Sequence, residues 1–339
     1  MIVKKMPILQ GFPDFETVKN LSGELFFAED FSPVFYDIET TGLGRNSTFL
    51  YLIGAVCREE TGWQLYQWLG AGAEEEKMVL EAFVDFVTNF TCVISYNGEQ
   101  FDAPYLEARL KVHNLASPFP GKSSLDLYKA LKPLKGLLKL PGMKQPQMEA
   151  FLGAQDRIFC DGAQCIRLYR KYVSCRDEQA MEAVLGHNRE DLLGLGRVFE
   201  MLSYLCLARR DYTCTDAEFD GGTLILQAEA PCPFPAAFSN KAGEFYITGK
   251  DRTVKVAVKA ANGRVRQYYA NYRNYDYLPA EDMAIPKSLG QFMDKSLRVR
   301  ATRDTCYTWF DCTREFLADR EKQKDYMGHC MEYLIWKLK

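Results

Sequence analysis

The sequence has little that could form a zinc site. Its 339 residues include only three histidines, and its eleven cysteines form no Cys-x-x-Cys pair. An odd number of scattered cysteines does not indicate a disulfide framework either. We therefore expect reduced thiols, most of them small core residues, as in cytoplasmic proteins.

Long apolar runs and a strong excess of one charge are absent as well. No stretch approaches 18 uncharged apolar residues, and the N-terminal sequence MIVKKMPILQG has no apolar run of signal-peptide length. These absences predict a cytoplasmic protein with no membrane partner. The net charge of −3 is not the basic excess that holds a protein to nucleic acid by charge alone. A nucleic-acid partner would therefore be met by a local basic patch or through metal ions.

Length and composition predict two globular domains. A chain of 339 residues is long for one domain, and 47% hydrophobic with 26% charged residues fits a substantial core. Residues 1–33 are a lead-in of mixed pattern, in which Leu25–Phe27 could add an edge strand. We place a first domain at 34–210 and an accessory domain at 211–339, where the sequence alternates and is rich in Tyr and Val.

The stretch FYDIETTGLG, residues 35–44, carries two carboxylates at the end of an apolar run. The run is rich in strand formers and ends at Thr-Thr-Gly, which indicates a buried strand. Because side chains alternate along a strand, Asp37 and Glu39 point to the same side. If they are buried, a divalent cation bound by both would relieve their repulsion. If the strand ends in solvent, neighbouring acids cost little, so both interpretations stay open.

The elements that follow occur in the order of a ribonuclease H-like fold. Residues 49–59 and 62–70 flank a Glu-Thr-Gly turn and predict a hairpin, and residues 74–90 have helical spacing. A further buried strand is expected at 92–97 and a helix at 101–114. A strand, a hairpin, a helix, a strand and a helix predict an α/β domain whose mixed sheet has helices on its faces.

A long helix expected from about residue 177 to 208 carries Asp191 within its apolar stripe. At 100° per residue Asp191 lies about 20° from Val184, near the middle of that stripe. A carboxylate there needs a partner, because burying an unpaired charge costs several kcal/mol or more. A metal, a lysine or a backbone group could each provide it, and His187 lies one turn earlier on the stripe's edge. Asp102, before another expected helix, could be a helix N-cap or a ligand.

Three motifs resemble those of DEDD-type 3′→5′ exonucleases. FYDIETTGL, SYNGEQFD and HNREDLL stand in the same order and at similar spacings. Together with YLIGAV, ISYNGEQFDAPYLEARL, LDLY, FLG and Tyr169, they make residues 34–208 similar to the YprB-type ribonuclease H-like domain. The resemblance implies a two-metal nuclease acting on DNA or RNA, with a single-stranded 3′ end as its substrate. A ribonuclease H-like endonuclease and a catalytically silent nucleic-acid-binding module are the alternatives.

The resemblance also implies roles for individual residues. The two Mg²⁺ or Mn²⁺ ions would be held by four carboxylates: Asp37, Glu39, Asp102 and Asp191. His187 would orient or deprotonate the attacking water, although it precedes Asp191 by four residues, the spacing of the family's tyrosine branch. The terminal nucleotide would lie against a further set: Thr40, Thr41, Gly42, Leu43, Tyr96 and Asn97. Asp126 is a candidate outer-shell group or a core hydrogen-bonding residue.

The accessory domain is expected to be α+β with a mainly antiparallel sheet. An Asn262–Gly263 turn between matching runs predicts a hairpin, and helical patterns occupy 281–296 and 313–338. Residues 241–273 hold eight basic against two acidic side chains. Three tyrosines are interleaved with them: Tyr268, Tyr269 and Tyr272. This pattern suits single-stranded nucleic acid through phosphate contact and base stacking, and equally an ordinary exposed sheet.

Overall fold

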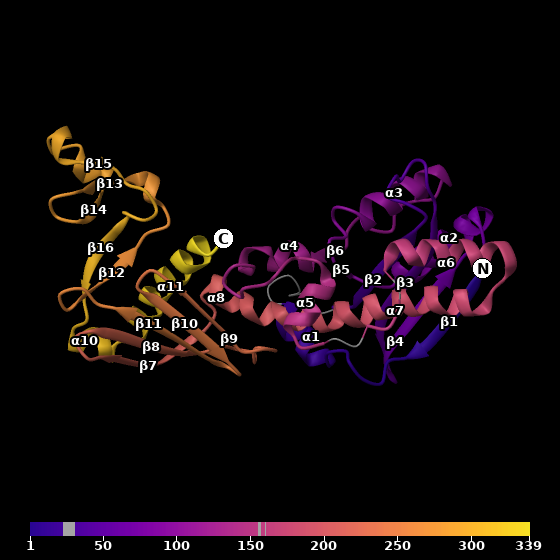
Figure 1. Cartoon of the computed structure of the whole chain (residues 1–339), viewed down its shortest axis with the longest axis horizontal. Helices are drawn as coiled ribbons and strands as arrows, with labels where there is room; N and C mark the ends of the chain where they lie inside the picture. Colours follow the sequence, from indigo (N-terminus) through magenta and orange to yellow (C-terminus); the bar gives the residue numbers. More distant parts are fainter. Residues whose placement is uncertain (23–30, 155–156, 160) are drawn as a thin grey trace. The chain divides into compact units, whose positions relative to one another are not determined.

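The computed structural model describes residues 1–22, 31–154, 157–159 and 161–339. Two compact units make up the chain (Figure 1). The first unit contains Met1–Lys132 and Gly142–Leu202, and the second contains Pro133–Pro141 and Ser203–Lys339. The edge strand considered at Leu25–Phe27 lies outside the described residues.

The first unit is built on a six-stranded mixed sheet with the order β1-β4-β3-β2-β5-β6. Its strands are β1 Ile2–Pro7, β2 Pro33–Thr40, β3 Leu50–Glu59, β4 Gly62–Leu69, β5 Cys92–Ser95 and β6 Ser123–Asp126. The pairs among β1, β4, β3 and β2 are antiparallel, and β5 and β6 continue the sheet in parallel. Strand β1 was not anticipated: its residues alternate in burial and pair with β4, so the lead-in belongs to the sheet.

Helices cover both faces of this sheet (Figure 1). They are α1 Phe15–Ser22, α2 Glu76–Val87, α3 Asp102–Val112, α4 Leu127–Leu131, α5 Gln145–Phe151, α6 Gly162–Cys175 and α7 Glu178–Phe199. Tyr36 of β2 packs towards α2, with its ring 5.8 Å from that of Phe83. Phe35 packs towards α7, with its ring 5.4 Å from that of Phe199. Asp37 and Glu39 have the parity of Phe35, so they face α7.

Close approach between α7 and the sheet requires a glycine at position 54. A Cβ atom there would lie 2.1 Å from Asn188 Oδ1 and 2.6 Å from a methyl carbon of Leu192. Gly54 is paired with Asp37 across β3 and β2. The missing side chain therefore lets α7 reach the sheet beside the strand acids. The helix expected over 177–208 is interrupted: α7 ends at Phe199, and a 3₁₀ turn leads into α8 Leu205–Arg209.

Glu76 ties three elements of the first unit together. Its buried carboxylate accepts from the backbone N–H of Leu50 at 2.8 Å and from Arg109 Nε and Nη2 at 2.7 and 2.6 Å. His113 Nε2 lies 2.8 Å from it. Burial raises the pKa of Glu76, but hydrogen bonds from Arg109 and His113 outweigh this and lower it. The network fixes α3, which begins at Asp102, against α2 and β3.

The second unit holds antiparallel sheets and the helices α8, α9 Lys287–Gly290, α10 Arg314–Ala318 and α11 Arg320–Lys337. A five-stranded sheet has the order β7-β8-β11-β10-β9, with β7 Thr213–Phe219, β8 Thr223–Glu229, β9 Phe238–Ala242, β10 Phe245–Lys250 and β11 Thr253–Lys259. The smaller sheets are β12-β16 and β14-β13-β15, with β12 Arg264–Tyr268, β13 Tyr275–Leu278, β14 Met283–Pro286, β15 Val299–Arg300 and β16 Tyr307–Asp311. The α+β expectation with a mainly antiparallel sheet is confirmed.

Two local expectations for the second unit are wrong. The Asn262–Gly263 turn forms, with both residues at positive φ, but β11 pairs with β8 and β10 whereas β12 pairs with β16. The helix expected over 281–296 is replaced by β14 and the short helix α9. The helical pattern at 313–338 is confirmed as α10 and α11.

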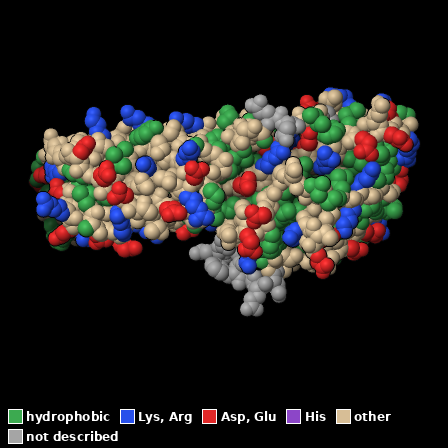
Figure 2. Space-filling view, turned by 90° about the horizontal axis from the view of Figure 1, so that it is seen from below, with side chains coloured by type: hydrophobic (Ala, Val, Ile, Leu, Met, Phe, Trp, Pro, Cys, Tyr) green, Lys and Arg blue, Asp and Glu red, His purple; other side chains and the backbone are tan. Residues whose placement is uncertain are grey.

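The surface carries charges of both signs. On the face shown in Figure 2, Lys and Arg side chains alternate with Asp and Glu side chains, in keeping with the net charge of −3. Of the helices in the described part of the chain, none combines the length and the apolar character needed to cross a membrane.

Candidate metal centre

Strand β2 presents Asp37 and Glu39 to the face of the sheet that α7 covers. Asn188 Nδ2 of α7 donates a 2.9 Å hydrogen bond to Asp37 Oδ2. Tyr51 of β3 donates to Glu39 Oε2 at 3.4 Å. The pairing of β2 with β3 shifts register between Glu39 and Thr40, so the strand becomes irregular directly after the two acids.

Asp191 of α7 completes a cluster of three carboxylates. One oxygen atom from each of Asp37, Glu39 and Asp191 lies within 4.8 Å of the others. Burial, followed by the nearby charge of Asp191, raises the pKa of both Asp37 and Glu39 well above the ordinary range. Three oxygen donors in a partly buried, electrostatically unfavourable arrangement fit a hard divalent cation.

Asp102 lies close enough to the cluster for its charge to act on Asp37. It is the first residue of α3, after the N-cap residue Phe101, and its side chain is 6% exposed. Burial raises its pKa to about 7, although the backbone N–H of Ile38, between the two strand acids, donates a hydrogen bond to it. Asp102 is not one of the three carboxylates within 4.8 Å of one another, but its charge contributes to the raised pKa of Asp37.

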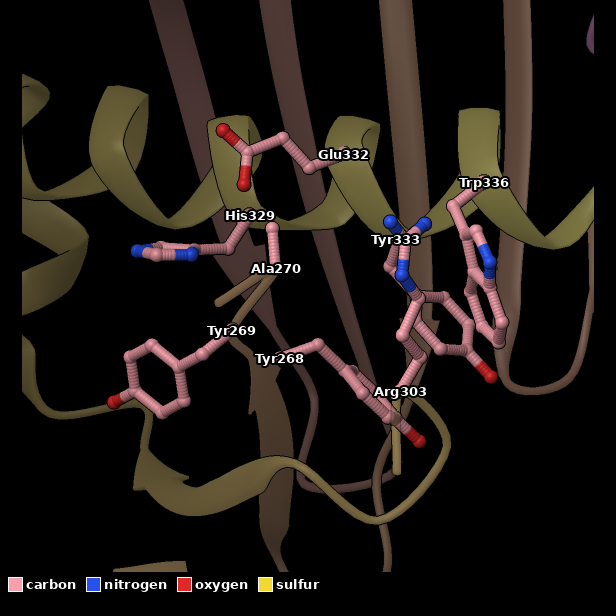
Figure 3. Close-up of a pocket in the computed structure, with 8 residues that line it drawn as sticks. All are labelled: Tyr268, Tyr269, Ala270, Arg303, His329, Glu332, Tyr333 and Trp336. Atoms are coloured by element: carbon pink, nitrogen blue, oxygen red, sulfur yellow. The ribbon is translucent and has the colours of Figure 1, made fainter. Parts of the chain in front are cut away.

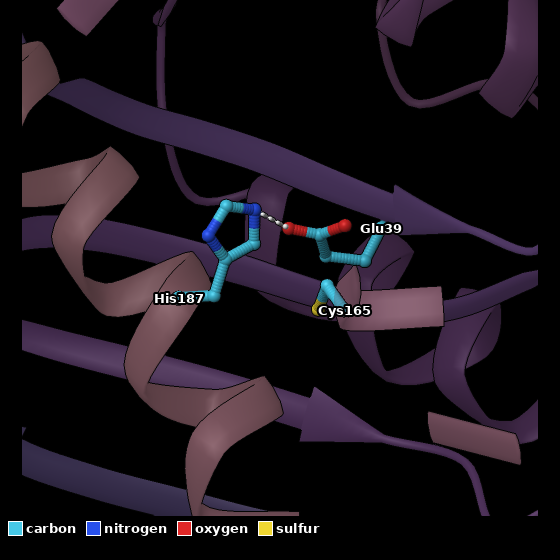
Figure 4. Close-up of side chains that lie close together, drawn as sticks. All are labelled: Glu39, Cys165 and His187. Carbon is cyan, nitrogen blue, oxygen red and sulfur yellow. Dashed lines mark ion pairs between the residues drawn. The ribbon is translucent and has the colours of Figure 1, made fainter. Parts of the chain in front are cut away.

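His187 lies between two members of the cluster, and Figure 4 shows its contact with one of them, Glu39. Its Nε2 atom is 3.4 Å from Glu39 Oε1 and 3.4 Å from Asp191 Oδ2. The ring is mostly buried, and its Nδ1 atom has no hydrogen-bond partner in the described part of the chain. The four-residue offset from Asp191 places both side chains on one face of α7.

A family model described as RNase_H superfamily (RNase_H_2) matches residues 34–203, half of the chain. The chain belongs to the RNase_H superfamily. A search of the curated proteins found no match. Among solved structures, the chain is similar to the family B DNA polymerase from the hyperthermophilic archaeon Pyrobaculum calidifontis, at 13% identity and a TM-score of 0.44. That match covers 92% of this chain and 48% of the polymerase chain.

The superfamily match contains the whole carboxylate cluster, and the observed mixed sheet agrees with it. The narrower resemblance to the YprB-type domain stays a prediction. The chain spans about half the length of the polymerase that it matches.

Two polar residues beside the cluster were missed in the sequence. Asn188 is fully buried and bridges Asp37 to Gln67, whose Nε2 donates to Asn188 Oδ1 at 2.8 Å. Arg157 Nη1 donates to Asp191 Oδ1 at 2.5 Å, and its other nitrogens bind Glu149. Of the partners considered for Asp191, a metal, a lysine or a backbone group, none was an arginine, yet the ion pair at this carboxylate is made by Arg157.

Asp126 organises the turn that leads to Asp102. It accepts hydrogen bonds from the backbone N–H groups of Asn97 at 2.9 Å, Glu99 at 3.1 Å and Lys129 at 3.3 Å. The last of these caps α4. Since Asn97 has a positive φ of 61°, the turn is a strained connection that Asp126 holds in place. Of its two expected roles, the structure places Asp126 in backbone hydrogen bonding.

The residues expected to contact a nucleotide lie in two segments. After β2, Thr40 Oγ1 and Thr48 Oγ1 donate to the carbonyl of Gly42 at 2.9 and 3.0 Å, and Leu43 is 85% exposed. Thr41 lies within the same turn, where its N–H donates to the carbonyl of Phe49 at 2.9 Å.

The second segment, Tyr96 and Asn97, follows β5, and its hydrogen-bonding groups have partners within the protein. Tyr96 Oη donates to the carbonyl of Met143 at 2.6 Å, and the N–H of Asn97 is bound by Asp126. The Tyr96 hydroxyl and the Asn97 N–H are thus already hydrogen-bonded within the first unit.

The second unit has a pocket of its own, between α11 and the loop after β12 (Figure 3). Eight residues line it: Tyr268, Tyr269, Ala270, Arg303, His329, Glu332, Tyr333 and Trp336. Its volume of about 20 Å³ admits a water molecule and nothing larger. Neither of the three-residue metal clusters in the described chain includes a residue of this pocket.

Proposed function

We propose that the chain is a metal-dependent nuclease that removes nucleotides from the 3′ ends of single-stranded DNA or RNA. The observation that carries the proposal is the convergence of Asp37, Glu39 and Asp191 within 4.8 Å on a fold of the RNase_H superfamily. Two strand acids and a helix acid come together from positions more than 150 residues apart in the sequence. A partly buried group of like charges has a clear purpose if it holds divalent cations.

The residues of the cluster suit Mg²⁺ or Mn²⁺. Asp37, Glu39 and Asp191 would hold the metal, with Asp102 completing the site from the start of α3. A pair of such ions stabilises the attacking and leaving oxygens of an in-line displacement at phosphorus. Asn188 supports this role, because its hydrogen bond favours the charged form of Asp37 that a metal requires.

His187 would receive the proton of the attacking water at Nε2. That atom faces the cluster, 3.4 Å from Glu39 Oε1 and Asp191 Oδ2. Catalytic hydrogen bonds are often long in ligand-free sites and tighten when substrate is bound. Its four-residue spacing from Asp191 is that of the family's tyrosine branch, and it places the His187 ring on the same face of α7 as Asp191.

The loop after β2 supports action at a chain end. Leu43 is 85% exposed on a turn that Thr40 and Thr48 hold through the carbonyl of Gly42, a few residues from Glu39. An exposed leucine beside a metal centre can pack against a terminal base, and Gly42 lets backbone approach closely. The 3′→5′ direction itself follows from the motif resemblance.

Cleavage of end-labelled oligonucleotides tests the proposal. Single-stranded DNA and RNA with a 5′ label should give a ladder of products shortened from the 3′ end in Mg²⁺ or Mn²⁺, and none in EDTA. Asp37→Ala should lose at least about 100-fold in rate, since even outer-shell changes at metal sites cost 10- to 100-fold. Asp85→Ala, an exposed acid of α2, is the control.

The other outcomes discriminate the alternatives. Internal products without a ladder would make the chain an endonuclease. Binding without cleavage under either metal would make it a silent binding module. Full activity in Asp37→Ala would refute the assigned site while leaving a nuclease.

A further inference from the structure

A buried thiol lies beside the carboxylate cluster and has no part in the chemistry proposed above. Cys165 of α6 is fully buried. Its Sγ atom, a carboxylate oxygen of Glu39 and a ring nitrogen of His187 all lie within 4.8 Å of one another (Figure 4). This second group shares Glu39 with the oxygen-only group of Asp37, Glu39 and Asp191.

The two groups differ in the metal that they suit. Mg²⁺ and Mn²⁺ prefer oxygen ligands, which the first group supplies. A thiolate, an imidazole and a carboxylate are ligands of Zn²⁺ and related transition metals, which take four ligands in a tetrahedron. Three protein ligands leave a fourth position for water. Glu39 therefore belongs both to a group of oxygen ligands that suits hard cations and to a group with a sulfur ligand that suits softer ones.

We propose that Glu39, Cys165 and His187 form a binding site for a thiophilic divalent metal of the zinc class, which overlaps the oxygen-lined site. Binding there draws Glu39 and His187 away from the oxygen-lined group and inhibits the nuclease. The inhibition, unlike the binding, rests on the function proposed above. The thiol proton of Cys165 passes to solvent when the sulfur coordinates the metal.

The surroundings hold the thiol and the carboxylate close together before any metal binds. The Tyr51 hydroxyl lies 3.4 Å from Glu39 Oε2 and 3.5 Å from Cys165 Sγ, so it bridges them. The Tyr51 ring stacks on Tyr169, one turn after Cys165 on α6, with centroids 3.8 Å apart and planes at 11°. This stacking fixes α6 against β3 and keeps Cys165 beside Glu39.

The histidine is held by packing more than by strong hydrogen bonds. Both Nε2 contacts, to Glu39 and Asp191, are 3.4 Å, longer than the 2.7–2.9 Å typical of charge-assisted hydrogen bonds. A ring held this way can give its Nε2 lone pair to a metal at small cost.

The distances leave room for an ion. Bonds of about 2.0–2.3 Å to zinc place tetrahedral ligand atoms roughly 3.5 Å apart. His187 Nε2 already lies 3.4 Å from Glu39 Oε1, and all three ligand atoms lie within 4.8 Å of one another, so no pair has to approach by more than about 1.3 Å.

Co²⁺ is the first probe, because a thiolate bound to it absorbs in the near ultraviolet. The full chain should show this band, and Cys165→Ser and Cys165→Ala should lose it. Zn²⁺ affinity, measured by displacement of Co²⁺, should fall by about tenfold or more in both variants.

Cys92→Ser is the matched control, since Cys92 is equally buried but lies in β5 away from the cluster. Circular dichroism and thermal unfolding establish that each variant is folded, and the two substitutions guard against failure of either one.

A band of unchanged intensity in both folded Cys165 variants, or its absence from the parent chain, overturns the proposal. This readout requires no catalysis. A chain with a Cys165-dependent band but no cleavage keeps the zinc-class site and refutes the nuclease.

The inhibition has its own test. Zn²⁺ should inhibit cleavage supported by Mn²⁺, and Cys165→Ser should raise the inhibitory Zn²⁺ concentration by about tenfold while leaving the rate without Zn²⁺ unchanged. Inhibition that is equally strong in Cys165→Ser and Cys92→Ser contradicts the inhibitory role.

Discussion

At the scale of single residues, Arg157 occupies a position that a metal ion would compete for. Its Nη1 lies 2.5 Å from Asp191 Oδ1, while Nη2 and Nε bind the two oxygens of Glu149 at 2.5 and 3.1 Å. Glu149 is buried, and Gln145 Nε2 bridges it to the backbone carbonyl of Asp191. The guanidinium is thus held over Asp191 by a second carboxylate, and it partly neutralises the cluster without a metal.

We predict opposite effects of Arg157→Ala on metal affinity and on stability. Mn²⁺ should bind about fivefold more tightly, because the metal no longer displaces an ion pair worth about 1 kcal/mol at Asp191. The metal-free protein should lose about 3 kcal/mol of unfolding free energy, because Glu149 is left buried without its partner. Electron paramagnetic resonance of free Mn²⁺ and denaturation in EDTA measure the two effects.

Arg157→Lys is the control for this prediction. It keeps the charge but not the fork that binds Glu149, so both effects should be intermediate. Weaker Mn²⁺ binding in Arg157→Ala would mean that the arginine supports the metal site instead of competing with it.

How far the sequence reveals such residues depends on periodicity. Asp37 and Glu39 follow from strand alternation, and Asp191 from its place in a helical apolar stripe. The same test would have found Asn188, which lies about 40° from Val184 at 100° per residue and is fully buried. Arg157 lies in an irregular segment without periodicity, so no pattern connects it to Asp191.

At the scale of elements, the turn at Asn262–Gly263 shows what a local signal leaves undetermined. The backbone reverses there, with a bridge between Ala261 and Arg264. The strands on either side then join different sheets, because β11 has both edges occupied by β8 and β10. Turn chemistry predicts a reversal, whereas the partner of each strand depends on long-range packing.

The basic segment 241–273 is likewise divided between two surroundings. Arg266 pairs with Glu244, and Tyr268 is buried beside it. The exposed tyrosine of the five-stranded sheet is instead Tyr246, which is paired with Lys241 across β10 and β9. Besides Lys241, three further exposed lysines lie on strands β10 and β11: Lys250, Lys255 and Lys259. Within the described residues, none of these four lysines forms a salt bridge with a carboxylate. We call the four together the lysine face.

This lysine face gives a prediction for nucleic-acid binding. Exchanging its four lysines together for glutamine should flatten the slope of log affinity against log salt by about 2.8, at about 0.7 for each phosphate contact on a single strand. Fluorescence anisotropy of a labelled oligonucleotide in EDTA measures the slope without cleavage. Four exposed lysines elsewhere, exchanged in the same way, serve as the control: Lys77, Lys111, Lys295 and Lys322. Equal slopes for both variants would mean that the lysine face does not contact the phosphates of the nucleic acid.

At the scale of the whole molecule, the second unit is not a continuous piece of chain. Residues Pro133–Pro141 belong to it, although they lie between parts of the first unit in the sequence. Asn240 Nδ2 donates to the carbonyls of Gly136 and Leu137 at 2.8 and 3.0 Å, and Leu137 is fully buried. A fragment beginning at residue 211, the boundary placed from the sequence, would lack these acceptors. Composition and pattern change near 211, but they do not show which earlier segment the second unit incorporates.

Stability of the whole chain should depend on pH in a direction set by the carboxylate cluster. Burial raises the pKa of Asp102 from 3.8 to about 7, and burial followed by the charge of Asp191 raises the pKa values of Asp37 and Glu39 as well. Between its unfolded-state pKa of 3.8 and its folded-state pKa of about 7, Asp102 binds more protons in the folded state than in the unfolded state. The unfolding free energy therefore falls as pH rises. For Asp102 this contribution to the unfolding free energy is fully present below pH 3.8 and is lost as pH rises through about 7. Its size is on the order of 4 kcal/mol.

Divalent metal should reverse this trend. In EDTA we expect the melting temperature to fall from pH 5 to pH 8, and in millimolar Mn²⁺ to stay level or rise, because the metal binds the deprotonated cluster of the folded state only. Asp102→Asn removes one titrating group and should flatten the decline in EDTA, whereas Asp85→Asn, at an exposed position of α2, should not. A melting temperature that rises with pH in EDTA would contradict the raised pKa values of the cluster. A melting temperature that Mn²⁺ leaves unchanged at pH 8 would mean that the acids do not hold a cation.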